Sequence, residues 1–147
     1  MKESTKVDLN INAYISEKYI KSDVQKMEMY QKISKVENSE ELVDIIDELT
    51  DRYGDIPKET LRLLNVVEIK YMANNIGIES IESSNNRIIF RFFNSDKLEM
   101  EKLSEVMKKM KGQLMFSAGE KPYITLSFEG TEDELLKNVK FLLQSLN

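Results

Sequence analysis

The chain has 147 residues, of which 41% are hydrophobic and 32% are charged, so it is long and apolar enough to fold around a core. It contains neither cysteine nor histidine, which excludes disulfides, thiolate zinc sites, cysteine nucleophiles and any Ser-His-Asp triad. The net charge of −5 disfavours extensive contact with nucleic-acid phosphates. These features favour a non-enzymatic domain with no cofactor, no metal and little or no direct nucleic-acid binding.

The beginning of the sequence, Met1-Lys2-Glu3-Ser4-Thr5, lacks the apolar stretch of a signal peptide. The sequence also has no run that approaches the 18 or so apolar residues of a membrane span. We therefore expect a cytoplasmic chain with no membrane partner.

The first 77 residues predict one strand followed by helices. Apolar and polar residues alternate from Lys6 to Ile15, which is the two-residue period of a half-buried strand. Such a strand needs a partner in this chain or in another domain. A first helix is expected from Ser22-Asp23 to about Val36, with an apolar stripe at three-residue spacing: Val24, Met27, Tyr30 and Ile33.

Two more helices are expected before the first half ends. The second runs from about Glu40 to Tyr53, with Asn38-Ser39 as its cap and Gly54 as the residue that ends it. The third runs from Pro57 to about Ile76 and is apolar around most of its circumference, which predicts a buried central helix.

The second helix carries the clearest pattern of the chain. Asp44, Glu48 and Asp51 fall within about 60° of one another at 100° per residue, with Arg52 on their flank. Three interpretations of these carboxylates stay open: a solvated helix face, a protein-contact surface or a metal site. The opposite side of the helix is an apolar stripe of Leu42, Ile45, Ile46, Leu49 and Tyr53.

Residues 78–147 predict two strand–strand–helix units. Strands are expected at 78–83, 87–93, 113–117 and 123–128, with a helix at about 96–111 between the two pairs. Thr131 followed by Glu134 is the signature of a capping box at the start of a last helix. The predicted fold class is therefore α+β, an N-terminal strand and three-helix half (1–77) followed by a ββαββα half (78–147). Together they form a single domain, 1–147, whose second half is an antiparallel sheet with two helices on one face.

No glycine motif for phosphate binding occurs, because none of the glycines precedes Lys-Ser/Thr at P-loop spacing and no GxGxxG is present. One segment is specific, however: residues 48–57 read Glu-Leu-Thr-Asp-Arg-Tyr-Gly-Asp-Ile-Pro. This segment resembles the E-L-x-D-R-[FY]-G-x-x-P signature of the C-terminal (TRCF) domain of bacterial transcription-repair coupling factors, the Mfd family. The resemblance extends from about Val7 to Ile81, through Ala13-Tyr14-Ile15 with Tyr19-Ile20, Met29 to Ile33, Leu63-Leu64 and Asn75 to Ile78.

Two positions depart from the family pattern. Ser16 stands where the family usually has proline, and Lys26 stands where it usually has arginine. Lysine lacks the planar fork of arginine, so a bidentate contact at position 26 is not expected.

The resemblance implies a regulatory part of a larger ATP-driven DNA translocase, which displaces stalled RNA polymerase and recruits nucleotide excision repair through UvrA. It implies that this domain packs on the UvrB-like N-terminal region of the same protein. This contact would hold the whole DNA-repair factor in an autoinhibited state. On this hypothesis Asp44, Glu48, Asp51 and Arg52 are the interface candidates, and Arg52 pairs with a partner carboxylate or supports Asp51.

Two other functions remain as alternatives. A metal-dependent hydrolase would use the acidic helix, and its divalent-ion binding would depend on Asp44 and Asp51. A small-molecule-sensing α+β domain would need a concave pocket with converging polar groups at the sheet.

Overall fold

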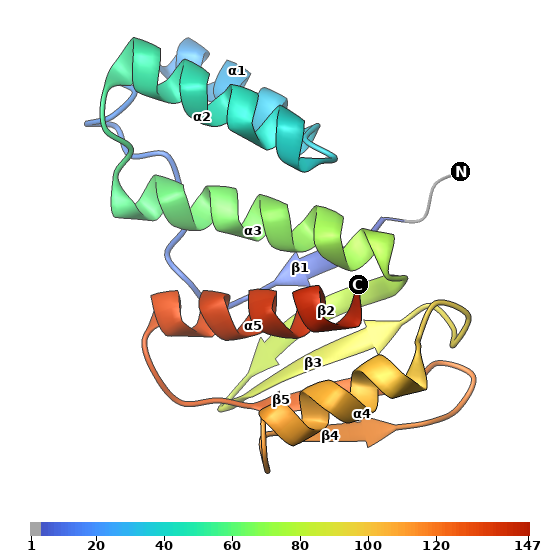
Figure 1. Ribbon diagram of the computed structural model, residues 1–147. Helices are drawn as coiled ribbons and strands as arrows, with labels where there is room; N and C mark the ends of the chain where they lie inside the picture. Colours follow the sequence, from blue (N-terminus) through green and yellow to red (C-terminus); the bar gives the residue numbers. More distant parts are fainter. Residues whose placement is uncertain (1–3) are drawn as a thin grey trace. The chain divides into compact units, whose positions relative to one another are not determined.

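The computed structural model describes residues 4–147, and these residues form two compact units. The sheet unit comprises the described residues up to Asn10 together with Met72–Asn147, and the helical unit comprises Ile11–Tyr71. The element order is a strand, three helices and then ββαββα (Figure 1), which confirms the predicted α+β class.

The helical unit contains α1 (Asp23–Ser34), α2 (Ser39–Tyr53) and the first part of α3 (Lys58–Asn75). Ser22 and Asn38 cap α1 and α2, since their side chains accept hydrogen bonds from backbone N–H groups in the first turn. The core of this unit is formed by eight buried side chains: Ile15, Ile20, Met29, Ile33, Leu42, Ile45, Leu49 and Leu64.

Two expectations for this half are wrong in detail. The helix α1 buries Met29 and Ile33, whereas Val24 and Met27 are 68% and 63% exposed, because the three-residue spacing drifts around a helix of 3.6 residues per turn. The helix α3 is not buried all round, since most of its side chains are half-buried and Leu61 is 45% exposed.

The sheet unit has five strands in the order β1-β2-β3-β5-β4. The strands are β1 (Lys6–Asp8), β2 (Ile78–Ser84), β3 (Arg87–Phe92), β4 (Leu114–Ser117) and β5 (Tyr123–Ser127). The last four are antiparallel as predicted, and β1 adds a parallel strand beside β2, so the partner of the N-terminal strand lies in this chain.

The first strand is much shorter than the expected range Lys6 to Ile15. Beyond Asp8 the backbone leaves the sheet, and residues 14 and 15 are held by hydrogen bonds to Glu59 and Tyr30 instead of by a neighbouring strand. The apolar alternation in the sequence extends beyond Asp8 because the segment that follows the strand is also half-buried.

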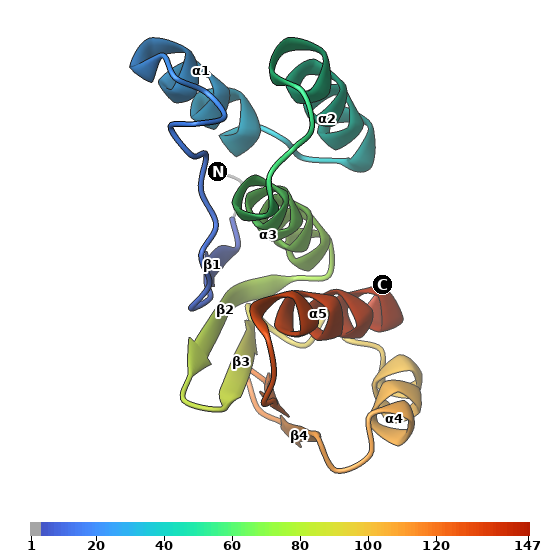
Figure 2. The same cartoon turned by 90° about the vertical axis from the view of Figure 1, so that its left-hand side faces the viewer.

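The helices α4 (Met100–Lys109) and α5 (Glu132–Leu146) lie on the same face of the sheet (Figure 2). They cover the inward side chains of the strands, among them Ile88, Phe90, Ile124 and Leu126, which are 0–1% exposed. The helix α4 begins four residues later than predicted, and residue 99 at its N-cap makes no side-chain capping bond.

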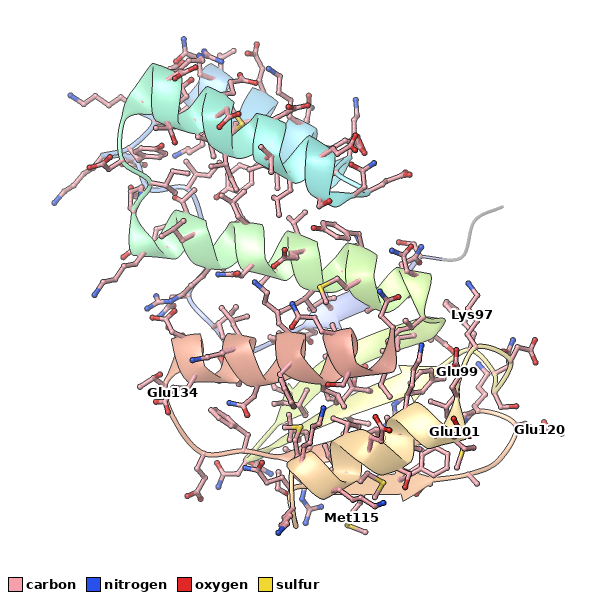
Figure 3. The ribbon with its side chains drawn as sticks, in the orientation of Figure 1. Lys97, Glu99, Glu101, Met115, Glu120 and Glu134 are labelled. Atoms are coloured by element: carbon pink, nitrogen blue, oxygen red, sulfur yellow. The ribbon has the colours of Figure 1, made fainter. Side chains whose placement is uncertain are left out.

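The start of α5 is fixed by the predicted capping box. The Thr131 side chain accepts a hydrogen bond from the Glu134 N–H at 3.1 Å, and the Thr131 N–H donates to the Glu134 carboxylate at 3.2 Å. Glu134 lies at the first turn of α5 in Figure 3, and these bonds from Thr131 lower the pKa of its carboxyl.

We expect Thr131→Ala to lower the free energy of unfolding by about 1 kcal/mol, because an orphan N–H of the first turn loses its acceptor. Thr131→Ser keeps the hydroxyl and should stay close to the wild type. Urea unfolding followed by circular dichroism measures both variants, and equal losses in the two would contradict a role for the cap.

Candidate functional site

The outward face of α2 is set by the burial of its opposite face. Leu42, Ile45 and Leu49 are buried in the core of the helical unit, which turns Asp44 and Asp51 toward solvent two helical turns apart. Among residues 4–147 neither carboxylate has a hydrogen-bond or ion-pair partner. The i, i+7 spacing separates their backbone positions by about 10 Å along the helix.

Glu48, the third carboxylate of this helix face, is engaged by two basic side chains. The Lys32 Nζ atom on α1 donates to both of its oxygens at 3.0 and 2.9 Å, and the Arg52 guanidinium donates to Oε2 at 2.9 Å. Its side chain is 28% exposed. The carboxylate therefore joins α1 to α2 instead of facing a partner alone.

Arg52 pairs with Glu48 and does not support Asp51. Its guanidinium carbon also lies 5.0 Å from the centre of the Tyr53 ring, a cation–π distance. These two contacts hold the side chain in a defined position while it remains exposed. Of the four candidates, the structure thus leaves Asp44, Asp51 and Arg52 at the surface and uses Glu48 within the unit.

Lys32 was not anticipated as part of this site. The i, i+4 spacing of Glu48 and Arg52 is a sequence signal for an ion pair on one helix. Lys32 lies 16 positions before Glu48 on another helix, so only the packing of α1 on α2 brings the two together.

The hydrogen bonds from Lys32 and Arg52 lower the pKa of Glu48 below its ordinary value of 4.5, although partial burial acts in the opposite direction. A carboxyl whose pKa is lower in the folded state contributes stability above its unfolded pKa, and that stability is lost as the pH falls through the folded value.

We therefore expect Glu48→Gln to destabilise the chain at pH 7 by up to about 1 kcal/mol, the range of exposed ion pairs. The difference from the wild type should narrow as the pH falls below 4.5, since protonation removes the same charge in the wild type. Urea midpoints across this pH range measure the effect. Asp44→Asn is the matched control, and an equal trend in that variant would contradict the assignment to the Lys32–Glu48–Arg52 network.

The C-terminal end of α2 is held by Tyr19 from the segment before α1. Its hydroxyl lies 2.8 Å from the Gly54 carbonyl oxygen and 3.1 Å from that of Leu49, so one proton serves two carbonyls at the helix end. Its ring lies 5.8 Å from that of Tyr53. Burial, with a smaller effect from the nearby Asp55 carboxylate, raises the pKa of the Tyr19 hydroxyl.

Gly54 completes this end of the helix. Its φ of +85° lies in the region that side chains with a Cβ rarely adopt, so glycine allows the chain to turn away directly after Tyr53. The Gly54 N–H still donates to the Thr50 carbonyl at 3.0 Å. The segment that carries the family signature is thus a helix end whose geometry depends on Tyr19 and Gly54.

We expect Tyr19→Phe to lower stability by about 0.5–1.5 kcal/mol through loss of the shared hydrogen bond while the ring packing is kept. Amide hydrogen exchange should accelerate most in the last turn of α2. Uniform acceleration throughout the helical unit, with no local maximum there, would show that the hydroxyl does not hold the helix end.

A surface cavity of about 830 Å³ lies in the helical unit beside the segment 14–19. Polar groups at its wall include Lys26, Tyr30 and Glu59. All of its lining residues belong to the helical unit, whereas the small-molecule-sensor alternative would place its pocket at the sheet.

No group of three or more His, Cys, Asp or Glu side chains in residues 4–147 is arranged to hold a metal ion. The acidic residues of α2 are therefore spread along a helix face and do not converge on one point.

None of the helices in residues 4–147 has the length and hydropathy of a membrane span.

The family model of the TRCF domain matches residues 9–103, which include the whole helical unit and the first two antiparallel strands. The chain belongs to the TRCF domain family. The transcription-repair-coupling factor of Staphylococcus haemolyticus is 33% identical over 153 aligned residues, covering 95% of this chain and 12% of that protein. That of Staphylococcus epidermidis is 45% identical over 82 residues, covering 56% of this chain and 7% of that protein.

The Borreliella burgdorferi transcription-repair-coupling factor is 28% identical over 145 residues, which is 99% of this chain and 13% of that protein. The chain thus spans 7–13% of the length of these three relatives. A crystal structure of the C-terminal domain of transcription-repair coupling factor shares the fold, with a TM-score of 0.88 over 99% of this chain and 92% of that chain, at 20% sequence identity. The TRCF domain assignment from the signature at residues 48–57 is therefore confirmed.

Proposed function

We propose that this chain acts as the non-catalytic regulatory domain of a transcription-repair coupling factor, with its two units working as one domain. In this proposal the full-length protein is a DNA translocase that displaces stalled RNA polymerase and recruits excision repair through UvrA. The TRCF family match over residues 9–103 carries the proposal. The absence of histidine, cysteine and a glycine phosphate loop from the sequence supports a non-catalytic role.

The outward face of α2 is the proposed contact with the UvrB-like region of the same protein. Asp44 and Asp51 are exposed, have no partner among residues 4–147 and stand about 10 Å apart on a helix whose other side is anchored in the core. Charged groups that are exposed and held in register favour specific but reversible association, which suits an inhibitory contact that must be released.

Arg52 adds a positive group at the end of this face. Glu48 and Tyr53 fix its position, so little side-chain entropy is lost when the guanidinium meets a partner carboxylate. In the proposal Glu48 thus acts by positioning Arg52, and Asp44, Asp51 and Arg52 make the direct contacts.

Charge reversal tests this interface in a full-length factor that carries the domain. Asp44→Lys with Asp51→Lys should raise basal ATP turnover and UvrA binding several-fold or more, because like charges then oppose each other across the closed interface. The isolated 147-residue chain with the same changes should melt close to the wild type, since both side chains are exposed.

The matched control is Glu101→Lys with Glu105→Lys, which makes the same charge change on the exposed side of α4. This control should leave ATP turnover and UvrA binding unchanged. A double variant of α2 that melts normally but leaves both activities at the wild-type level would show that this face is solvated and that inhibition uses another surface.

A further inference from the structure

The sheet of the sheet unit has a second face that α4 and α5 do not cover (Figure 2). Register identifies the side chains on it, because residues directly paired across antiparallel strands project to the same side. Arg87, Ile89 and Arg91 on β3 pair with Ser127, Thr125 and Tyr123 on β5, and β4 continues these rows. We call this surface the arginine face; its members are Arg87, Ile89, Arg91, Met115, Ser117, Tyr123, Thr125 and Ser127.

The composition of the arginine face differs from that of the rest of the chain. These eight positions hold two of the four arginines and no carboxylate, whereas the adjacent row of the same sheet face, on β2, carries Glu82 directly opposite Ile89. Met115 is 73% exposed, Tyr123 is 38% exposed and Ile89 is half-buried. Arginine, tyrosine and methionine are the residue types enriched where proteins contact one another, whereas a merely solvated sheet face is rich in lysine and acidic side chains.

Both guanidinium groups lack an internal acceptor. Within residues 4–147 neither Arg87 nor Arg91 makes a side-chain hydrogen bond or an ion pair, and Arg91 only stacks on Tyr123 at 5.6 Å. The two arginines lie four residues apart on one strand, about 14 Å along it, with Ile89 between them. A planar guanidinium donates in pairs to carboxylates, so these groups suit a partner with two carboxylates at matching spacing.

The surroundings of the arginine face indicate where such a partner would lie. Glu82 on β2 and Asp8 on β1 belong to the same side of the sheet, next to the β3 row. They would repel an acidic partner on that side. Met115 belongs to β4, at the edge of the sheet opposite β1 (Figure 3), so the uncharged rows of β5 and β4 continue the face away from the carboxylates.

We propose that the arginine face binds an acidic polypeptide segment of a partner protein, with carboxylates on Arg87 and Arg91 and an apolar side chain on Ile89. This surface lies in the sheet unit and is separate from the α2 contact, so the proposal goes beyond the regulatory function proposed above. Nucleic acid is disfavoured as the occupant, because two arginines and one exposed aromatic side chain supply few phosphate contacts and a single stacking platform.

A titration of the isotope-labelled 147-residue chain tests the proposal by nuclear magnetic resonance. The probe is a peptide of three Glu-Ser-Val-Ser repeats, which places glutamates four residues apart with valine midway. We expect shifts of amide signals in β3, β5 and β4, weaker binding when ionic strength rises from about 0.05 to about 0.3 M, and no binding by the peptide with glutamine for glutamate.

Arg87→Gln with Arg91→Gln should weaken peptide binding roughly tenfold or more, since two charge-assisted contacts are lost. Lys108→Gln with Lys109→Gln is the control, because it removes the same charge from α4 on the covered side of the sheet. Arg87→Lys with Arg91→Lys keeps the charge and should bind between the wild type and the glutamine variant.

Four outcomes would overturn the proposal. The first is no shift with the peptide, and the second is equal weakening of peptide binding by the lysine-pair control. The third is tighter, arginine-dependent binding of oligothymidine of the same length, which would make this a nucleic-acid surface. The fourth is concentration-dependent self-association in sedimentation equilibrium that the arginine variant abolishes, which would make the occupant a second copy of the chain.

Discussion

The outward chemistry of the helical unit depends on the burial of one side of α2. Leu42, Ile45 and Leu49 are 0–7% exposed, and burial of side chains of this size contributes about 1.5–3 kcal/mol each. A helix anchored in this way cannot rotate about its axis without exposing that surface. The same constraint therefore fixes the direction of Asp44 and Asp51, which themselves take part in no stabilising contact among residues 4–147.

Polar contacts add two features to this hydrophobic packing, a link between α1 and α2 and a support at the end of α2. The Lys32–Glu48–Arg52 network links α1 to α2 at the surface, since the Lys32 ammonium reaches both oxygens of Glu48. The Tyr19 hydroxyl supports the end of α2 by donating to the Leu49 and Gly54 carbonyls. The family signature at residues 48–57 thus combines one side chain that joins two helices, one that faces outward and a glycine that permits the turn.

In the sheet unit too, the burial of one face determines what the other face presents, here with the two-residue period of a strand. Ile88, Phe90 and Phe92 are buried under the helices, so the residues that alternate with them along β3, from Arg87 to Arg91, must project to the other face. In a chain with excess negative charge, this places Arg87 and Arg91 together on an uncovered surface. The two surfaces of opposite charge, the acidic side of α2 and the arginine face, thus both follow from which side chains the core requires.

The sequence by itself determined the α+β class, the order of elements, the caps at Asn38 and Thr131, and the outward direction of Asp44 and Asp51. These features are local, because periodicity and capping depend on residues within a few positions of one another. The signature at residues 48–57 also identified the family, since it fixes several residue types at fixed spacing.

Only the tertiary structure decided the pairing of β1 with β2, the early end of that strand and the engagement of Glu48 by Lys32. Each of these depends on contacts between residues far apart in the sequence, from 16 positions for Lys32 and Glu48 to 74 for Lys6 and Ser80. Local patterns indicate which side of an element is apolar. The packing of the whole chain determines which neighbour covers that side and which charged groups the neighbour places beside it.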